Sequence, residues 1–192
     1  DLSQGTFAEE SIPDAMVQKY LAGIGLGAAL LHREMPIGAD PLGPENILGF
    51  LPGLLTGAGS LFTGRWMVVG KSPLTGTWGD ANCGGTLAYA IKQCGYDGIF
   101  FKGASSTPVY FLCDDRGPRL VDAAHLWGKD AVETEDALLA AHSQKRVPAV
   151  AAIGQAGENL SLISGIVNDR GRLAARSGLG AVMGSKKLKA VV

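Results

Sequence analysis

The 192-residue sequence lacks three features that would each define a class of protein: closely spaced cysteine pairs, a long apolar run and a basic stripe. Its three cysteines, Cys83, Cys94 and Cys113, are widely spaced and form no CxxC pair, which excludes a disulfide framework and a zinc or cluster site built from these residues. No run of about 18 apolar residues occurs, so no membrane-spanning helix is expected. The net charge is −1 and both signs are well mixed, which excludes a basic surface for nucleic acid and a polybasic membrane anchor. A small molecule is therefore the expected partner.

Two further absences concern the ends of the sequence. It does not begin with Met, and its acidic start, with Asp1, Glu9 and Glu10, is unlike the basic start of a signal peptide. It stops at Val192 within an apolar run. Unpaired cysteines fit a reducing cytoplasm. We therefore expect a domain cut from a longer cytoplasmic protein.

Glycine, by contrast, is abundant. The 28 glycines are roughly twice the usual share of about 7%, and they lie at predicted turns and helix starts without a collagen period or a low-complexity run. The 46% of hydrophobic residues and 18% of charged residues are typical of a globular protein. The length allows one sizeable domain or two small ones.

Hydrophobic patterns and turn signals predict short strands mixed with helices. The helix at 133–142 is expected to be capped near Thr134, and residues 154–157 are expected to form a turn. Helices are predicted at residues 14–31, about 85–94, 133–142 and after Gly178, and strands at residues 46–51, 66–71, 99–102, 109–113, 119–121, 149–153, 160–167 and 188–192.

The most informative stretch runs from Thr63 to Gly85. A strand at 66–71 leads into a Pro/Gly turn, and Asn82-Cys83-Gly84-Gly85 then opens the predicted helix. The first N–H groups of a helix have no partner within the helix, and glycine lets a ligand approach the backbone. This turn is therefore expected to bind an anion such as phosphate.

A second part of the chain repeats this pattern without repeating its residues. Strand, polar turn, glycine-containing helix start, helix and strand occur both in about 45–105 and in about 145–192. An arginine precedes each helix start, Arg65 in the first unit and Arg172 in the second. If the units face one another, the two helix starts share a cleft that suits a ligand with two anionic arms.

Two nucleotide-binding motifs are rejected near the second helix start. The segment Gly178–Gly184 has one residue too many for the dinucleotide fingerprint, and it follows an arginine-rich turn rather than a strand. The segment Gly180–Lys186 imitates a phosphate loop, but its serine precedes its lysine, which reverses the order that places lysine on the phosphates.

Several motifs occur in a fixed order along the chain: Thr63-Gly64-Arg65, Lys71-Ser72-Pro73-Leu74-Thr75-Gly76, Ala81-Asn82-Cys83-Gly84-Gly85, Gly95-Tyr96-Asp97, Asp122-Ala123-Ala124-His125-Leu126-Trp127-Gly128, Ile153-Gly154-Gln155-Ala156-Gly157-Glu158-Asn159, Asn168-Asp169 and Gly178-Leu179-Gly180-Ala181-Val182-Met183-Gly184-Ser185-Lys186. Together they resemble the N-terminal domain of the tungsten-containing aldehyde ferredoxin oxidoreductases. The likeness covers nearly the whole chain, and the length of several motifs makes it specific.

The resemblance implies an α+β fold for residues 1–192, with two β-sheets and flanking helices related by a pseudo-two-fold. These sheets would form a saddle that carries a tungsten bis-pyranopterin cofactor. A magnesium ion held by main-chain carbonyls would bridge the two pterin phosphates. The implied cofactor contacts are Arg65, Asn82 and Gly84 in a first set and Arg172, Leu173 and Ala175 in a second, with the carbonyls of Asn82 and Leu173 on magnesium.

These residue types suit such a ligand. Arginine presents a fork of donors to phosphate or pterin oxygen, and Gly84 lets the backbone come close. A carbonyl ligand depends little on its side chain, so Leu173 is acceptable. Ala175 departs from the glycine that is common in the family. Its methyl group either pushes the second pterin outward or is tolerated where the backbone φ is negative.

For the full-length protein, the resemblance implies oxidation of an aldehyde to a carboxylate with ferredoxin as electron acceptor. The ligands of a 4Fe-4S cluster and the substrate channel would lie in C-terminal domains of the same chain. No catalytic acid or base is expected in this segment, which would be inactive alone. Two alternatives stay open: a related tungsten or molybdenum enzyme that reduces a carboxylate or an aromatic thioester, and a non-catalytic binding module, which Ala175 favours.

Overall fold

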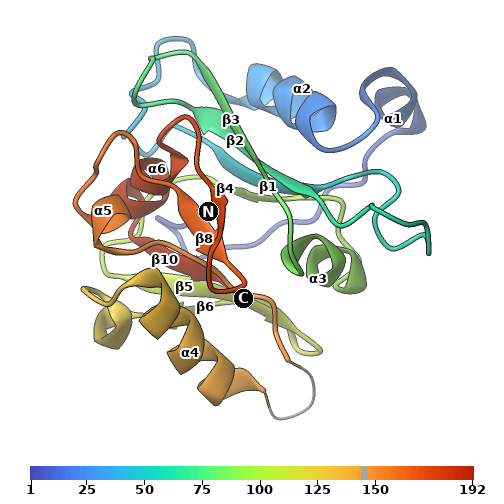
Figure 1. The fold of residues 1–192 in the computed structure, drawn as a ribbon. Coiled ribbons are helices and arrows are strands. Elements are labelled where there is room, and N and C mark those ends of the chain that lie inside the picture. Colours follow the sequence, from blue (N-terminus) through green and yellow to red (C-terminus); the bar gives the residue numbers. More distant parts are fainter. Residues whose placement is uncertain (144–146) are drawn as a thin grey trace.

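The computed structural model describes residues 1–143 and 147–192, in which strands lie at the centre and helices pack around them (Figure 1). The strands are β1 (Leu48–Pro52), β2 (Trp66–Lys71), β3 (Trp78–Cys83), β4 (Ile99–Phe101), β5 (Val109–Asp114), β6 (Gly117–Asp122), β7 (Ala151–Ala152), β8 (Ile166–Asn168), β9 (Arg172–Ala174) and β10 (Leu188–Val191). The helices are α1 (Asp14–Tyr20), α2 (Ile24–Glu34), α3 (Leu87–Gln93), α4 (Ala131–His142), α5 (Gln155–Glu158) and α6 (Leu179–Ser185), and a 3-10 turn lies at Ala124–Leu126.

These strands form two sheets. Within the described residues, sheet A has four strands in the order β3-β2-β1-β4, and sheet B has six in the order β6-β5-β10-β7-β8-β9. The predicted hairpin of β5 and β6 forms one edge of sheet B, where β5 pairs in parallel with β10. The expected α+β class, with two sheets and flanking helices, is confirmed.

The two sheets contain a four-stranded unit of the same topology. In sheet A, β1, β2, β3 and, after α3, β4 are joined by antiparallel pairs in the order β3-β2-β1-β4. In sheet B, β7, β8, β9 and, after α6, β10 are joined by antiparallel pairs in the order β9-β8-β7-β10. The pattern shared by about 45–105 and 145–192 therefore extends to strand order. The expected start of the second unit, near residue 145, lies outside the described residues.

Aromatic side chains connect the two sheets. Phe50 on β1 stacks on Trp66 of β2 with ring centroids 5.7 Å apart, and it meets Phe101 of β4 edge to face at 5.8 Å. Phe101 in turn meets Phe111 of β5, in sheet B, edge to face at 5.3 Å. All four side chains are buried. Each such pair contributes about 0.5–1.5 kcal/mol beyond the burial of its area, so these rings help to hold sheet A against sheet B.

Helix α6 packs against both sheets and is almost entirely buried. It contacts β1, β2 and β3 of sheet A, β10 of sheet B, and helix α5. A β-carbon at Gly184 would lie 2.0 Å from the carbonyl oxygen of Gly157 on α5, and one at Gly180 would lie 2.5 Å from that of Gly165. Glycine is required at both positions because any side chain would force these elements apart.

The single helix expected at 14–31 is instead two helices. Helix α1 ends at Leu21, which has a φ of 60°, and α2 begins after Gly23, which has a φ of 57°. Positive φ values interrupt the helical path, and glycine adopts them without steric cost whereas leucine does not. The expected helix was therefore wrong at its centre.

Helix α4 begins at Ala131, two residues earlier than expected. Its cap is Asp130 rather than a residue near Thr134, and the Asp130 carboxylate accepts hydrogen bonds from the N–H groups of Val132 and Glu133 at 2.8 Å each. The Asp130 N–H donates to the Glu133 carboxylate at 3.1 Å, which completes a capping box. An acidic residue followed three positions later by glutamate is the sequence signal for this start.

The region between β7 and β8 differs most from the expectation. The strand expected at 160–167 exists only at its end, as β8, because Leu160 has a φ of 57° and the residues after it form turns. The expected turn at 154–157 is mostly the short helix α5, and the strand expected at 149–153 is reduced to β7. The apolar run at 160–167 predicts a strand, but such a run also occurs in an irregular loop, as it does here before β8.

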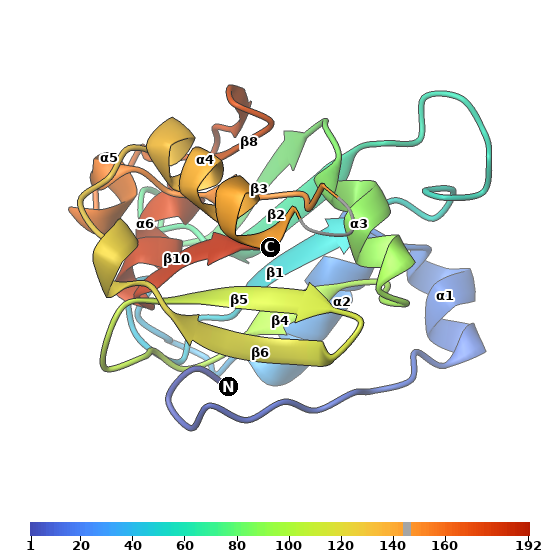
Figure 2. The same ribbon diagram turned by 90° about the horizontal axis from the view of Figure 1, so that it is seen from below.

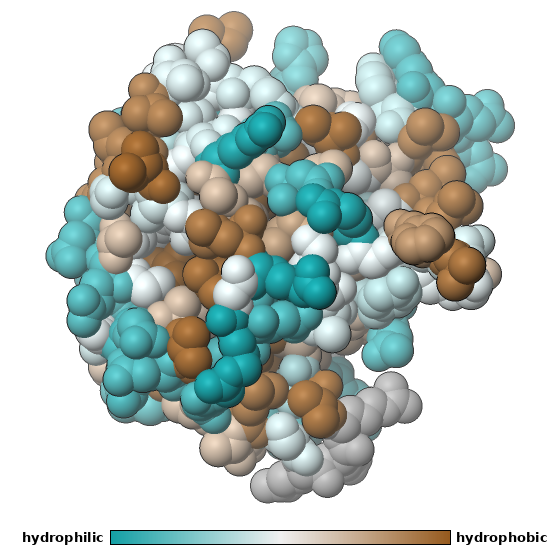
Figure 3. All heavy atoms as spheres, in the orientation of Figure 1, coloured by the Kyte–Doolittle hydropathy of each residue, from teal (hydrophilic) through white to brown (hydrophobic). Residues whose placement is uncertain are grey.

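Apolar side chains are also exposed on the surface. On the face shown in Figure 3 they form separate patches divided by hydrophilic side chains. Four of them, Leu54, Leu55, Leu61 and Phe62, belong to the loop between β1 and β2, which extends away from the sheets in Figure 2. Across residues 1–143 and 147–192, no helix combines the length and hydrophobicity that crossing a membrane requires.

Lys186, directly after α6, is a fully buried cation. Its Nζ donates hydrogen bonds to the carbonyl oxygens of Gly103 at 2.8 Å and Pro44 at 3.3 Å. Burial lowers the pKa of Lys186 to about 8, and the negative charge of Glu45 opposes this shift only in part.

We expect Lys186 to make the free energy of unfolding rise by about 3 kcal/mol between pH 8 and pH 10.5, the ordinary pKa of a lysine side chain. In this window the unfolded chain still carries a proton on the amine whereas the folded chain does not, so raising the pH favours the folded state. The variant Lys186→Met loses this slope. Urea unfolding of the 192-residue chain at several pH values measures the difference, and equal slopes in both proteins would contradict it.

Candidate functional site

Two strands that the sequence did not predict bring the expected site residues together. Strand β3 is one of the two edge strands of sheet A and β9 is one of the two edge strands of sheet B, and these two edges contact one another. Asn82 lies on β3, while Arg172 and Leu173 lie on β9. Residues more than 85 positions apart in the chain therefore meet where the sheets meet.

A pocket of about 270 Å³ opens at this junction. Four of the six expected contact residues line it: Asn82 on β3, Leu173 on β9, Arg65 directly before β2 and Ala175 directly after β9. Its lining is Arg65, Asp80, Asn82, Leu173, Ala175 and Arg176.

The other two expected residues, Gly84 and Arg172, lie beside this pocket. A β-carbon at Gly84 would lie 3.4 Å from Nη1 of Arg172 and 3.6 Å from Nη1 of Arg65. The two guanidinium groups therefore approach the same point from the two sheets, and the bare backbone of Gly84 leaves the space between them open. Two guanidinium groups around one space are suited to an anionic ligand.

Arg65, directly before β2, is oriented by Asn82 on the neighbouring strand β3. Its Nε donates a hydrogen bond to the side-chain oxygen of Asn82, and its Nη2 lies 3.5 Å from the Asn82 carbonyl oxygen. The amide nitrogen of Asn82 donates to the sulfur of Met67 at 3.2 Å. Asn82 therefore fixes the position of Arg65, and it lies on β3 rather than at the opening of a helix.

Ala175 lies on the pocket wall without backbone strain. It is absent from the residues with positive φ, so its backbone is in a region that any residue adopts. A negative φ is the condition under which a methyl group is tolerated at this position, and Ala175 meets it. Its side chain still occupies space at the pocket surface that a glycine would leave open.

The expected anion site at two helix starts was wrong in its geometry. Asn82 and Cys83 end a strand, and α3 begins only at Leu87. The N–H of Thr86, at the start of α3, donates to the Asp169 carboxylate at 2.9 Å. At the start of α6, the N–H of Gly180 donates to the carbonyl oxygen of Ser164 at 3.1 Å. One N–H group at each helix start thus has a partner within the chain, and Asn82 and Leu173 on the two strand edges line the pocket instead.

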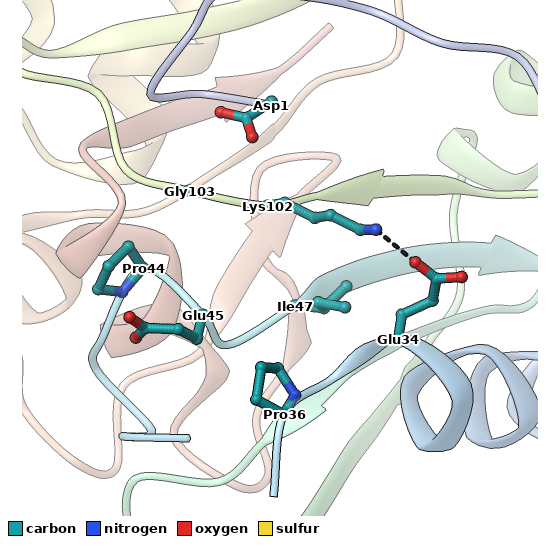
Figure 4. Close-up of a pocket in the computed structure, with 8 residues that line it drawn as sticks. All are labelled: Asp1, Glu34, Pro36, Pro44, Glu45, Ile47, Lys102 and Gly103. Carbon is teal, nitrogen blue, oxygen red and sulfur yellow. Dashed lines mark hydrogen bonds and ion pairs between the residues drawn. The ribbon is translucent and has the colours of Figure 1, made fainter. Parts of the chain in front are cut away.

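A second cavity of similar size is chemically different. It lies between the loop after α2 and the end of β4, and Figure 4 shows Glu34 paired with Lys102 at its edge, at 2.6 Å. Glu45 and Asp1 add two further carboxylates. These acidic groups disfavour an anion, and none of the expected contact residues lines this cavity.

Comparison with known proteins gives the same assignment for the whole chain. The family model described as "Aldehyde ferredoxin oxidoreductase, N-terminal domain" matches residues 1–192. The chain belongs to this family. The resemblance read from the sequence motifs is thereby confirmed.

Relatives of this family domain differ in the reactions for which they are named. A "Tungsten-containing aldehyde ferredoxin oxidoreductase" of Thermococcus kodakarensis is 45% identical over 191 residues, which are 100% of this chain and 31% of that protein. An "Aliphatic sulfonate oxidoreductase, WOR-like subunit" of Pyrococcus furiosus is 33% identical over 100% of this chain and 33% of its own length. The chain spans about a third of the length of these relatives.

A solved structure is similar to this aldehyde ferredoxin oxidoreductase N-terminal domain in fold and sequence. The complex described as "Active site complex BamBC of Benzoyl Coenzyme A reductase in complex with 1,5 Dienoyl-CoA" superposes with a TM-score of 0.95 and 37% sequence identity. The match covers 99% of this chain and 29% of that one. The fold is therefore shared by members with different substrates.

Two residues of the pocket in this family domain were missed by the sequence analysis. Asp80 precedes Asn82 by two positions, so in a strand both point to the same face, and the burial along β3 alternates accordingly. Recognising β3 would have identified Asp80. Arg176 follows Ala175 directly, and only its proximity to the second set of contacts indicated it.

Proposed function

We propose that residues 1–192 are the domain that binds a tungsten bis-pyranopterin cofactor in a longer cytoplasmic oxidoreductase. The whole enzyme would oxidise an aldehyde and water to a carboxylate and pass two electrons to ferredoxin. The two units of like topology would be related by a pseudo-two-fold and form a saddle under the cofactor. The ligands of a 4Fe-4S cluster would lie in the C-terminal domains of the same chain.

The observation that carries this proposal is the shared pocket of the two sheet edges. Arg65 and Asn82, directly before β2 and on β3, meet Leu173 and Ala175, on β9 and directly after it, and the family resemblance implies all four as cofactor contacts. Guanidinium groups on both sides suit a ligand with two phosphate arms. A β-carbon would fill the space at Gly84, which supports a close approach of the ligand to the backbone there. The residues present therefore fit the group.

The arginine side chains and the main-chain carbonyls of the site would have distinct tasks. Arg65 and Arg172 would donate hydrogen bonds to phosphate or pterin oxygens. The main-chain carbonyls of Asn82 and Leu173 would supply neutral oxygen ligands to a magnesium ion between the phosphates, which is the ligand type that magnesium accepts. Both residues line the same pocket, which supports a single bridging ion.

When bound, the tungsten centre supplies the oxygen-transfer and two-electron chemistry of the reaction. The domain itself binds and orients the cofactor, and it contributes no acid or base to the substrate.

Reduction of an aromatic thioester is the second candidate. The structural match to the benzoyl coenzyme A reductase complex, with 37% identity and a TM-score of 0.95, supports it. The greater identity of 45% to the Thermococcus kodakarensis enzyme favours aldehyde oxidation. A related molybdenum enzyme is a further alternative. A non-catalytic module has less support, because the backbone of Ala175 is unstrained.

Elemental analysis tests the proposed function. The full-length protein is purified without oxygen from cells supplied with tungsten and molybdenum, and tungsten, molybdenum, iron and phosphorus are measured per chain. Tungsten together with iron supports the aldehyde oxidoreductase, and turnover of aldehydes compared with aromatic thioesters then distinguishes the two candidates. A folded protein without tungsten and molybdenum would contradict the proposal and favour the binding module.

Two adjacent glycines should respond differently to alanine. At Gly84, the added carbon makes ordinary contacts at 3.4 and 3.6 Å, so we expect Gly84→Ala to change the free energy of unfolding by less than about 0.5 kcal/mol but to lower the pterin content about tenfold. At Gly85, φ is 111° and the carbon would lie 2.5 Å from Asn168 and Asp169, so Gly85→Ala should destabilise the fold itself. Fluorescence of released pterin and thermal unfolding separate the two effects.

A further inference from the structure

Asp169 lies in the turn between β8 and β9 and reaches across to sheet A. Its carboxylate accepts a hydrogen bond from the N–H of Thr86 at 2.9 Å and another from the Thr86 hydroxyl at 2.7 Å. These two bonds join the turn of sheet B to the start of α3, two residues after Gly84. Hydrogen bonds to an ionised carboxylate are stronger than those between neutral groups.

The same carboxylate also faces the second arginine of the pocket. Oδ2 of Asp169 lies 3.9 Å from Nε of Arg172. Nη1 of Arg172 lies 3.4 Å from the β-carbon position of Gly84, beside Nη1 of Arg65. Asp169 therefore contacts the chain next to Gly84 on one side and Arg172 on the other.

The turn that carries Asp169 is held in an uncommon conformation. Asp169 has a φ of 47° and Arg170 a φ of 60°, a region that aspartate tolerates better than most residues. Helix α4 fixes the turn from the opposite side through the buried Glu135, whose carboxylate accepts a hydrogen bond from the N–H of Arg170 at 2.9 Å. The Arg170 guanidinium pairs with Asp136 at the exposed surface and adds little to this. Conformations of this kind persist where surrounding contacts hold them, and they are frequent at functional sites.

We propose that Asp169 is a positioning residue of the cofactor site, which sets the distance between the Gly84–Gly85 segment and Arg172 and orients the Arg172 guanidinium. This inference rests on the proposed function of the pocket. Asp169 does not itself contact the anionic ligand, whose charge it would repel. It acts through Thr86 and Arg172. It also packs closely against Gly85, because a β-carbon at Gly85 would lie 2.5 Å from Oδ2 of Asp169.

The test compares four forms of the full-length protein: wild type, Asp169→Ala, Asp169→Asn and the matched control Asp136→Ala. Asp136 is on the other side of the same turn, and its pairing with Arg170 is exposed, so the control removes a carboxylate without touching Thr86 or Arg172. Pterin and tungsten per chain are measured together with the temperature of unfolding.

We expect the pterin and tungsten content per chain of Asp169→Ala to be at least tenfold lower than that of wild type. Asp136→Ala should retain more than half of the wild-type content of both. Asp169→Asn should be intermediate, because one amide oxygen still accepts from Thr86 while the charge beside Arg172 is gone. Unchanged pterin in Asp169→Ala, or equal losses in Asp169→Ala and Asp136→Ala, would overturn the inference. If Asp169→Ala does not fold, Asp169→Asn decides: it must lose at least threefold more pterin than Asp136→Ala. Wild-type protein without pterin overturns the proposed function instead, and the inference with it.

Discussion

Replacing Arg65 and Arg172 together by alanine is expected to lower the pterin and tungsten content of the full-length protein at least a hundredfold. The two guanidinium groups meet at Gly84, 3.6 and 3.4 Å from its β-carbon position, one from each sheet. A hydrogen bond to a charged group contributes about 1.5–3 kcal/mol, which corresponds to roughly a tenfold to hundredfold change in affinity for each arginine. Because both act on one ligand, the losses need not add.

The control for this experiment is Arg170→Ala. Arg170 lies in the turn that leads into β9, two residues before Arg172, and is similarly exposed, but its guanidinium pairs with Asp136 and not with the pocket. It should retain pterin and tungsten within about twofold of wild type, since exposed ion pairs contribute about 0–1 kcal/mol. Metal analysis and pterin fluorescence of wild type, the double variant and Arg170→Ala measure the cofactor content of each. If the double variant keeps its full cofactor content, the two arginines do not hold the ligand.

Gly184→Ala is expected to lower the free energy of unfolding by about 4 kcal/mol, which is large for a single methyl group. The added carbon would lie 2.0 Å from the carbonyl oxygen of Gly157 and 2.7 Å from its carbonyl carbon. Both are backbone atoms, so no side chain can rotate away. The strain is relieved only if α5 and α6 separate, and α6 also packs against both sheets. Thermal and urea unfolding of the 192-residue chain measure the effect.

Gly171→Ala is the matched control for this substitution. No atom lies within 4 Å of its β-carbon position, and its φ is outside the left-handed region, so the added methyl group meets neither a clash nor a strained backbone. We expect a change within about 0.5 kcal/mol of zero. A Gly184→Ala protein as stable as the Gly171→Ala protein would show that α5 and α6 are not tightly packed.

Much of the fold could be predicted because its signals are local. Strand β2 coincides with the predicted 66–71, and the hairpin of β5 and β6 was recognised from two apolar runs around an Asp/Gly turn. The motif residues Arg65 and Asn82 were assigned to one site without knowledge of how β3 pairs, and both line one pocket. Long specific motifs carry such information even where the secondary structure around them is misread.

The misread elements share a physical cause. Strand β3 contains Gly79, Asp80 and Asn82, all residue types with low strand propensity, and only its antiparallel pairing with β2 makes it a strand. Strand β9 has three residues, too few for a periodic pattern. Asp80 was missed with β3, and the role of Asp169 depends on a contact with Thr86 across 83 positions of sequence. Strand pairing and contacts between distant residues produce no recognisable pattern in the local sequence, so they could not be predicted from it.

The central place of β10 in sheet B has a consequence for the order in which the chain folds. Sheet A uses residues 48–101 only, so all its strands have left the ribosome well before β10 does. Sheet B cannot close in this way, because β10 (188–191) must insert between β5 (109–114) and β7 (151–152). Until it does, the β5–β6 hairpin presents an open strand edge to other nascent chains. We therefore infer that sheet A forms early during synthesis, and that the interval before β10 emerges is the period when aggregation is most favoured.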